Sequence, residues 1–444
     1  MEQPRWQHEL EGPEPSAQVA SPRALVIDLE GVLLRSNLLL EALFSRPGRM
    51  FARFGAGGRA GMPALTDVLA RARIDYAHLP YDGDVLNRAL AARARGAKIY
   101  LAASRFEGHA AAIAAHLGFD GVVTSAALAA GDAAALPFDP QAVDHVAGRS
   151  DAPRAGWRIW AKALRVYQYA KNTLVFVPAV TAHQMSFEAL GHALLAFIAF
   201  SACASGAYLM NDLIDLAADR THPTKRHRAL AAGDLPIAHA LLAIPALWLV
   251  AIAAGLCISG VFLGVLGAYL ATTIVYSLVL KRKMLLDVVT LAGLYTLRIV
   301  AGAVGVGVVL SEWLLMFSLF VFTSLALIKR FSELTLRHGA GLADPANRDY
   351  RISDLQVIAA MAAASGMNAV IVFSLYVSSS AVTTLYSRPW MLWLLNPLLL
   401  YWFGRALMMA HRREMPDDPI LYTFRDSASR ITVAAMICIM LAAI

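Results

Sequence analysis

The chain has 444 residues, of which 58% are hydrophobic and only 16% are charged, and its formal net charge is +7. Soluble proteins carry about 25% charged residues, so this composition excludes an ordinary soluble enzyme. Beyond about residue 165 the charges are confined to short loops between long apolar runs. The sequence predicts a soluble N-terminal part followed by a polytopic membrane domain. The positive balance then marks cytoplasmic loops, and nucleic acid is not an expected partner.

The N-terminal part predicts a small α/β domain over residues 24–125, preceded by a disordered segment, 1–23, without a signal peptide. The segment ALVIDLEGVLLR predicts a buried strand that ends at Asp28 and a glycine turn. A second strand, KIYLAAS, ends at Ser104, and a helix leads to a third at 118–125. Residues 126–156 are rich in Ala, Gly, Asp and Pro and are predicted as a linker.

These two strands resemble motifs one and two of the haloacid-dehalogenase-like (HAD-like) phosphatases. That family uses a first Asp as nucleophile and an Asp two residues later as acid/base. Asp28 matches the first, but Glu30 replaces the second and its extra methylene would misplace the proton donor. Ser104 ends the stretch that resembles motif two. The resemblance therefore implies a degenerate, non-catalytic domain. The alternative is a phosphatase that acted on the product of the membrane domain.

Nine candidate membrane spans make up the predicted all-α domain, 157–444. Lys171 and Asn172 interrupt the first span, and the last is short. A segment rich in Trp, Tyr, Lys and Arg, 157–169, predicts an interfacial helix before them. The predicted limits of the spans are 166–183, 187–210, 236–256, 258–280, 285–306, 312–332, 354–378, 389–411 and 428–444.

The loops after the even-numbered spans hold 17 Lys and Arg, whereas the opposite loops hold one, Arg388. Positive residues remain in the cytoplasm, so these loops and the N-terminal domain are predicted to face it. The expected location is the inner (plasma) membrane. The three cysteines, Cys203, Cys257 and Cys438, lie in apolar stretches and are expected to be buried hydrophobes.

An acidic motif, NDLIDLAAD, ends the second span at residues 211–219. Asp212, Asp215 and Asp219 follow helical spacing, which predicts one helix face, and Asn211 joins that face. Three like charges require a cation, and Mg²⁺ with oxygen ligands is the expected one. Lys225, Arg226 and Arg228 belong to the basic run that follows; such cations can neutralise a diphosphate. The alternative is a plain charged loop.

The acidic motif matches NDxxDxxxD, and over about 165–444 the chain resembles the UbiA superfamily of intramembrane prenyltransferases. The resemblance implies nine helices around a central cavity. Aromatic prenyltransferases carry a second Asp-rich motif after span four, where this chain has Tyr276, Lys281 and a single carboxylate, Asp287. That pattern is similar to decaprenyl-phosphate phosphoribosyltransferases, as are residues 164–178, 219–228 and 329–334. Ala229 departs from that branch, which usually has Pro there.

That branch implies transfer of 5-phosphoribose from phosphoribosyl pyrophosphate to a polyprenyl phosphate, a step of cell envelope biosynthesis. The resemblance assigns Mg²⁺ to Asp212 and Asp215, with Asp219 completing the shell or orienting a base. The alternatives are prenyl transfer from a prenyl diphosphate, and a transporter without chemistry. The expected ligands of the donor 5-phosphate and the lipid phosphate are cations: Lys171, Lys225, Arg226, Arg228, Lys281, Arg298, Lys329 and Arg330.

Several of these residues also have structural interpretations. Asp287 and Arg298 lie on nearly the same face of span five, where ionisable residues indicate function or an ion pair with a neighbouring helix. Arg330 and Lys329 form either a phosphate site or a helix-end cluster with Glu333. Tyr276 is either an interfacial anchor or a substrate contact. The sequence does not indicate an oligomeric state.

Overall fold

The computed structural model of the chain describes residues 24–44, 72–140, 143–147, 156–345, 348–415 and 419–444. The chain forms two compact units. One contains Met1–Leu164 and Tyr208–Ile244, and the other contains Arg165–Ala207 and Pro245–Ile444. The predicted disordered segment, 1–23, lies outside the described residues.

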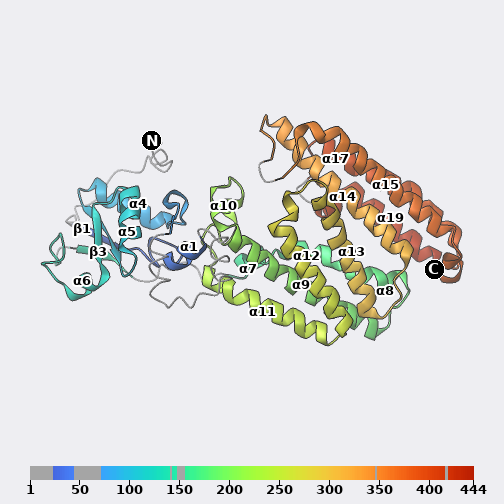
Figure 1. Cartoon of the computed structure of the whole chain (residues 1–444), viewed down its shortest axis with the longest axis horizontal. Helices are drawn as coiled ribbons and strands as arrows, with labels where there is room; N and C mark the ends of the chain where they lie inside the picture. Colours follow the sequence, from blue (N-terminus) through green and yellow to red (C-terminus); the bar gives the residue numbers. More distant parts are fainter. Residues whose placement is uncertain (1–23, 45–71, 141–142, 148–155, 346–347, 416–418) are drawn as a thin grey trace. The chain divides into compact units, whose positions relative to one another are not determined.

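A parallel four-stranded sheet with strand order β3-β2-β1-β4 forms the core of the first unit (Figure 1). The strand bounds are β1 (Ala24–Asp28), β2 (Lys98–Ala103), β3 (Gly121–Thr124) and β4 (Val143–Val146). Strand β1 is almost wholly apolar, as expected for a strand covered on both faces. The helices of this α/β part are α1 (Leu38–Phe44), α4 (Gly83–Ala94), α5 (Glu107–Leu117) and α6 (Ser125–Ala130).

The predicted linker, 126–156, is wrong in its first part. It supplies most of α6 and all of β4, which pairs with β1 from Ala24↔Val143 to Ile27↔Val146. The sequence of β4 is VDHV. Its two polar residues interrupt the apolar run from which a buried parallel strand is predicted. The α/β fold therefore extends beyond residue 125.

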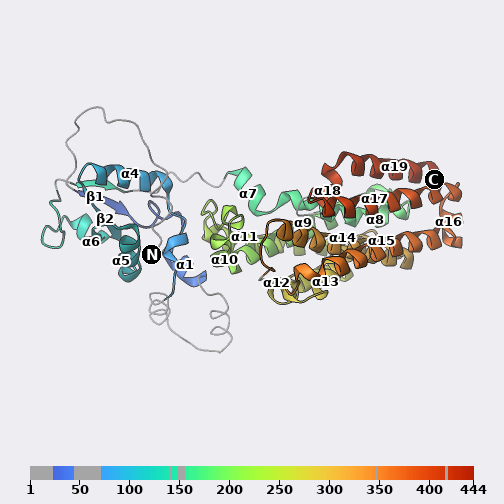
Figure 2. The ribbon, with the colours of Figure 1, turned by 90° about the horizontal axis from the view of Figure 1, so that it is seen from above.

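Seven helices of the described residues are long and apolar enough to cross a membrane. Figures 1 and 2 show α14, α15 and α17 packed side by side in the second unit. The helix bounds are α9 (Phe187–Ile214), α11 (Ile237–Leu256), α12 (Gly260–Leu278), α13 (Leu286–Val306), α14 (Glu312–Gly339), α15 (Leu355–Val377) and α17 (Leu395–His411).

The other two of the nine predicted spans are shorter or irregular. The first is a 3₁₀ helix, Val166–Phe176, followed by α8 (Val177–Thr181). Asn172 in this segment is buried, donates to Ser201 Oγ at 3.0 Å and accepts from Arg298 Nε at 2.8 Å. A hydropathy pattern does not indicate that a polar residue such as Asn172 is buried and hydrogen-bonded to other helices. The last predicted span is α19 (Ser427–Ala443), an apolar helix of 17 residues.

The predicted interfacial helix is also shorter than expected. Helix α7 (Trp157–Ala163) ends two residues before Arg165, whose φ of 54° lies in the left-handed region. That conformation interrupts a right-handed helix and separates α7 from the 3₁₀ segment.

Gly302 on α13 permits close contact with the 3₁₀ segment. A Cβ on Gly302 would overlap the Val175 carbonyl oxygen and lie 2.8 Å from the carbonyl carbon. We expect Gly302→Ala to lower the free energy of unfolding of the detergent-solubilised protein by about 1–3 kcal/mol, the usual cost of overpacking. The melting temperature should fall accordingly. The control is Gly293→Ala on the same helix, where a Cβ would meet nothing within 4 Å. Equal melting temperatures for the two variants would contradict the close approach.

Candidate active site

The acidic motif lies at a break between two helices. Helix α9 ends at Ile214, and Asp215, with φ −89° and ψ 5°, precedes α10 (Leu216–Thr221). The helix is therefore interrupted at Asp215, because Asp and Asn compete with backbone groups and favour helix ends. The helical hydrogen bonds nevertheless continue. Asp215 N donates to Asn211 O at 2.9 Å, and Asp219 N donates to Asp215 O at 2.8 Å.

Two of the three carboxylates converge on one cationic group. Arg228 Nη1 donates to Asp212 Oδ1 at 3.1 Å and to Asp219 Oδ2 at 2.6 Å. The two aspartates are 6% and 2% exposed. Buried anions this close repel each other, so they require a shared positive charge. The structure thus brings two oxygen ligands to a common point that favours a cation.

Asp215 is hydrogen-bonded to Asn211, the first residue of the motif. Its Oδ2 accepts a hydrogen bond from Asn211 Nδ2 at 3.2 Å. Among the described residues, no three His, Cys, Asp or Glu side chains are grouped to hold a metal by themselves. A Mg²⁺ ion commonly binds one or two carboxylates and completes its shell with water and substrate oxygens, so the Asp212–Asp219 pair fits this ion. A ligand role for all three aspartates stays a prediction.

Burial raises the pKa of Asp219 above the usual aspartate value, and the neighbouring Arg228 counteracts this rise. Lys225 Nζ lies 4.0 Å from Asp219 Oδ1 and adds positive charge on the same side. The basic tail is also tied to the interfacial helix, because Lys162 Nζ donates to His227 O at 2.6 Å. The predicted phosphate ligand Arg226 is exposed on this tail. Acidic and basic groups therefore meet within one loop.

A second charged cluster, in the second unit, surrounds Asp287 at the start of α13. Asp287 is fully buried, and its Oδ2 lies 2.7 Å from Arg330 Nε and 3.4 Å from Arg348 Nη1. Tyr350 donates its hydroxyl proton to Asp287 Oδ1 at 2.5 Å. Arg330 also pairs with Glu333 Oε2 at 2.5 Å. The contacts of Arg330 and Glu333 are thus those of a charged cluster at a helix end.

Arg348 and Tyr350 are residues of this cluster that the sequence pattern does not indicate. Both follow α14 in the loop before α15, more than 60 residues from Asp287. Tyr350 also accepts from Leu285 N at 2.9 Å, and Leu285 has φ 62°. Positive φ is rare for a residue with a branched side chain, so Tyr350 holds a constrained turn beside the predicted ligand Lys281. A short motif search cannot detect such distant pairing.

Arg298 belongs to a different network from Asp287, although both lie on α13. Its guanidinium is 4% exposed and donates to Asn172 Oδ1, Tyr269 OH and Leu294 O at 2.6–2.8 Å. Each guanidinium nitrogen thus has a neutral acceptor inside the bundle, which is the arrangement of a structural residue. Lys171 Nζ lies 5.7 Å from the Tyr295 ring centroid. Three other predicted ligands are half-buried: Tyr276, Lys281 and Lys329.

The phosphatase-like residues of the α/β part follow the pairing of the neighbouring parallel strands β1 and β2, in which Asp28 is opposite Ala102. Asp28 Oδ1 lies 3.0 Å from His145 Nε2, a β4 residue that the sequence analysis missed within the predicted linker. Glu30 Oε1 accepts from Leu38 N at 3.2 Å and so caps helix α1. Ser104 is exposed. Glu30 thus has a structural contact of its own, and the absence of catalysis stays a prediction.

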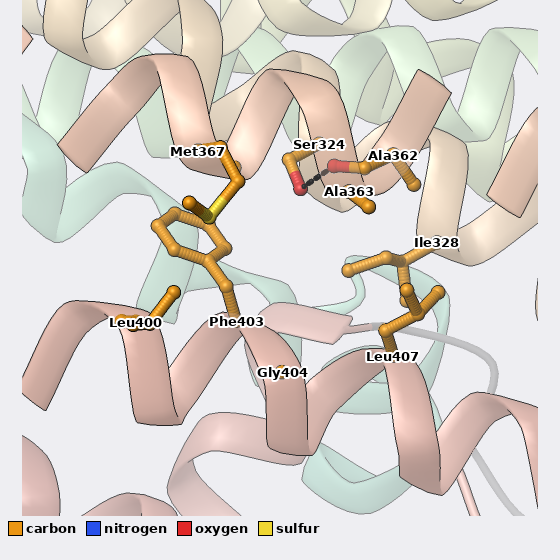
Figure 3. Close-up of a pocket in the computed structure, with 10 residues that line it drawn as sticks. Ser324, Ile328, Ala362, Ala363, Met367, Leu400, Phe403, Gly404 and Leu407 are labelled. Carbon is orange, nitrogen blue, oxygen red and sulfur yellow. Dashed lines mark hydrogen bonds between the residues drawn. The ribbon is translucent and has the colours of Figure 1, made fainter. Parts of the chain in front are cut away.

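Figure 3 shows a cavity of about 90 Å³ between α14, α15 and α17. Its lining is apolar except for Ser324, whose hydroxyl donates to Ala362 O at 2.8 Å. Met367 and Phe403 come from two helices that face each other (Figure 3). No charged residue lines the cavity, so it does not provide the predicted phosphate chemistry.

Comparisons with known proteins agree with the helical fold. Residues 173–428 match the UbiA prenyltransferase family. The uncharacterized protein y4nM of Sinorhizobium fredii is 33% identical over 91% of this chain and 88% of its own length. The decaprenyl-phosphate phosphoribosyltransferase of Mycobacterium tuberculosis is 33% identical over 41% of this chain and 62% of its own length.

A solved structure shows the same helical fold. It is a UbiA homolog from Archaeoglobus fulgidus bound to GPP and Mg²⁺. It covers 63% of this chain and 99% of its own chain, with a TM-score of 0.50 and 16% sequence identity.

Proposed function

Because the chain belongs to the UbiA prenyltransferase family, we propose that it transfers 5-phosphoribose from phosphoribosyl pyrophosphate to a polyprenyl phosphate. A lipid phosphate oxygen attacks the anomeric carbon of the donor, the bond from that carbon to the diphosphate breaks, and diphosphate leaves. The observation that supports this proposal most directly is that Asp212 and Asp219 converge on Arg228, beside a basic tail. The phosphoribosyltransferase relative supports this donor and acceptor.

Asp212 and Asp219 are the residues that would hold Mg²⁺, and the ion would supply positive charge to the diphosphate leaving group. The solved relative with Mg²⁺ supports a divalent ion. Arg228 and Lys225 reach the same point and would neutralise the remaining phosphate charge. Asp215 and Asn211 would orient this group. A phosphate monoester is already anionic, so catalysis would depend on positioning and leaving-group stabilisation.

The second cluster favours phosphoribosyl transfer over prenyl transfer. Asp287 forms ion pairs with Arg330 and Arg348 and accepts a hydrogen bond from Tyr350, so its charge is balanced by arginines of the protein. Residues 276–302 also carry a single carboxylate, Asp287, instead of the several carboxylates of a second Asp-rich motif. Lys281 and Lys329 stay predicted ligands of a phosphate group. We place the basic loops and the α/β domain in the cytoplasm and the helices in the plasma membrane.

The alternative is transfer of a prenyl group from a prenyl diphosphate, and the solved relative bound to GPP and Mg²⁺ favours it. Membranes containing the protein should be incubated with labelled phosphoribosyl pyrophosphate and polyprenyl phosphate. A parallel assay should contain a labelled prenyl diphosphate and an aromatic acid. The proposal expects labelled lipid in the first assay only. A labelled prenylated product in the second assay alone would overturn it.

A further inference from the structure

A buried ion pair joins the α/β part of the first unit to residues 211–233. This segment contains the acidic motif and the basic tail, and we call it the acidic loop. Arg220 directly follows Asp219, and its guanidinium meets Glu41 on helix α1. Nη2 donates to Glu41 Oε1 at 2.7 Å, and Nη1 donates to Oε2, so the pair is bidentate. The residues are 7% and 4% exposed. Arg220 belongs to the basic run after the acidic motif, but the sequence does not indicate its pairing with Glu41, which lies 179 positions away.

The same arginine also contacts the C-terminal part of the loop. Arg220 Nε donates to Ala231 O at 3.2 Å, which joins the two ends of the basic tail. Gly233, with φ +75°, approaches Pro80 of the α/β part so closely that a Cβ would lie 2.8 Å from the Pro80 Cβ. Arg35 Nη1 lies 3.9 Å from Asp234 Oδ1. The loop that carries Arg228 is therefore held at its beginning and at its end.

Glu30 supports the helix that supplies this contact. Its carboxylate accepts from the backbone of Leu38, the first residue of α1, and Glu41 lies one turn later. A carboxylate at a helix N-terminus stabilises that helix through the exposed N–H groups and the helix dipole. The residue that departs from the phosphatase motif thus contributes to the position of Glu41.

We propose that the α/β domain positions the acidic loop, with Glu41 and Arg220 as positioning residues for the Asp212–Asp219 pair. The inference rests on the proposed function of that pair. A buried arginine that loses its carboxylate retains an uncompensated charge, so it would leave its place and move the loop. Asp219 is the adjacent residue and would lose its alignment with Arg228. This role of the domain does not require chemistry at Asp28.

The test compares Glu41→Gln, Arg220→Gln and the charge-swapped double variant Glu41→Arg/Arg220→Glu in the full-length membrane protein. We expect each single variant to raise the KM for the diphosphate donor and the Mg²⁺ concentration for half-maximal rate about tenfold or more. The swapped pair should recover most of this loss, because the two charges meet again. The control is Asp84→Asn, an exposed acid in the first turn of α4.

Single variants that are folded and keep the wild-type KM and Mg²⁺ dependence would overturn the inference. A swapped variant as impaired as the single variants would also overturn it, because pairing would then not position the loop. Failure of the proposed function gives a different result, since the wild-type protein would not transfer phosphoribose. The same comparison would then use the prenyl transfer rate.

Discussion

Replacing Asp212 with Asn is expected to lower kcat/KM for the donor by about 10²–10³-fold, the usual effect of removing one group that stabilises developing charge. Asn keeps the shape of the side chain but removes the negative charge that it shares with Asp219 around Arg228. The loss should be accompanied by a higher requirement for Mg²⁺. Steady-state rates over a range of Mg²⁺ concentrations measure both effects.

The matched control is Glu188→Gln, an exposed acid in the first turn of α9, the helix that also carries Asp212. This variant makes the same change of carboxylate to amide at the other end of the helix and should keep the wild-type rate. If Asp212→Asn kept full turnover and an unchanged Mg²⁺ dependence, the assignment of this carboxylate to the metal would be wrong.

The second large effect concerns stability. Asp287→Ala should lower the free energy of unfolding by about 3–5 kcal/mol, because it leaves the buried Arg330 without its carboxylate. Arg330 is 2% exposed, and among the described residues it would retain the ion pair with Glu333 on its own helix. Thermal unfolding in detergent measures the loss. Tyr350→Phe removes the hydrogen bond to the same carboxylate and the one from Leu285 N, and should cost about 1–3 kcal/mol.

A double variant separates the buried charge from lost packing. Asp287→Leu combined with Arg330→Met replaces the pair by apolar side chains, and such replacements of buried pairs are often close to neutral. We therefore expect the double variant to be more stable than Asp287→Ala. A double variant that is the less stable of the two would contradict the account, because it would show that the pair itself, and not the unpaired charge, determines the loss.

The sequence predicted what depends on local pattern. Long apolar runs identified seven helices that meet the length and hydropathy of a span, and NDLIDLAAD identified the acidic motif. One error had a local cause as well, because the polar residues of β4 hid a buried strand. The irregular first span instead depends on hydrogen bonds of Asn172 with residues 29 and 126 positions away.

The remaining differences come from contacts between distant segments. The pairs Glu41–Arg220 and Asp287–Tyr350 join residues 179 and 63 positions apart, and neither side chain predicts its partner. His145 was missed for the same reason, since only the pairing of β4 with β1 brings it to Asp28. Periodicity places a residue on a helix face, whereas such contacts depend on how the elements pack.

The most direct test of the central claim is calorimetric titration of the detergent-purified protein with phosphoribosyl pyrophosphate, with and without Mg²⁺. The account predicts donor binding that requires the metal, disappears with a chelator and is strongly weakened in Asp212→Asn. Equal donor affinity in the presence and absence of the metal, or unchanged affinity in Asp212→Asn, would contradict it.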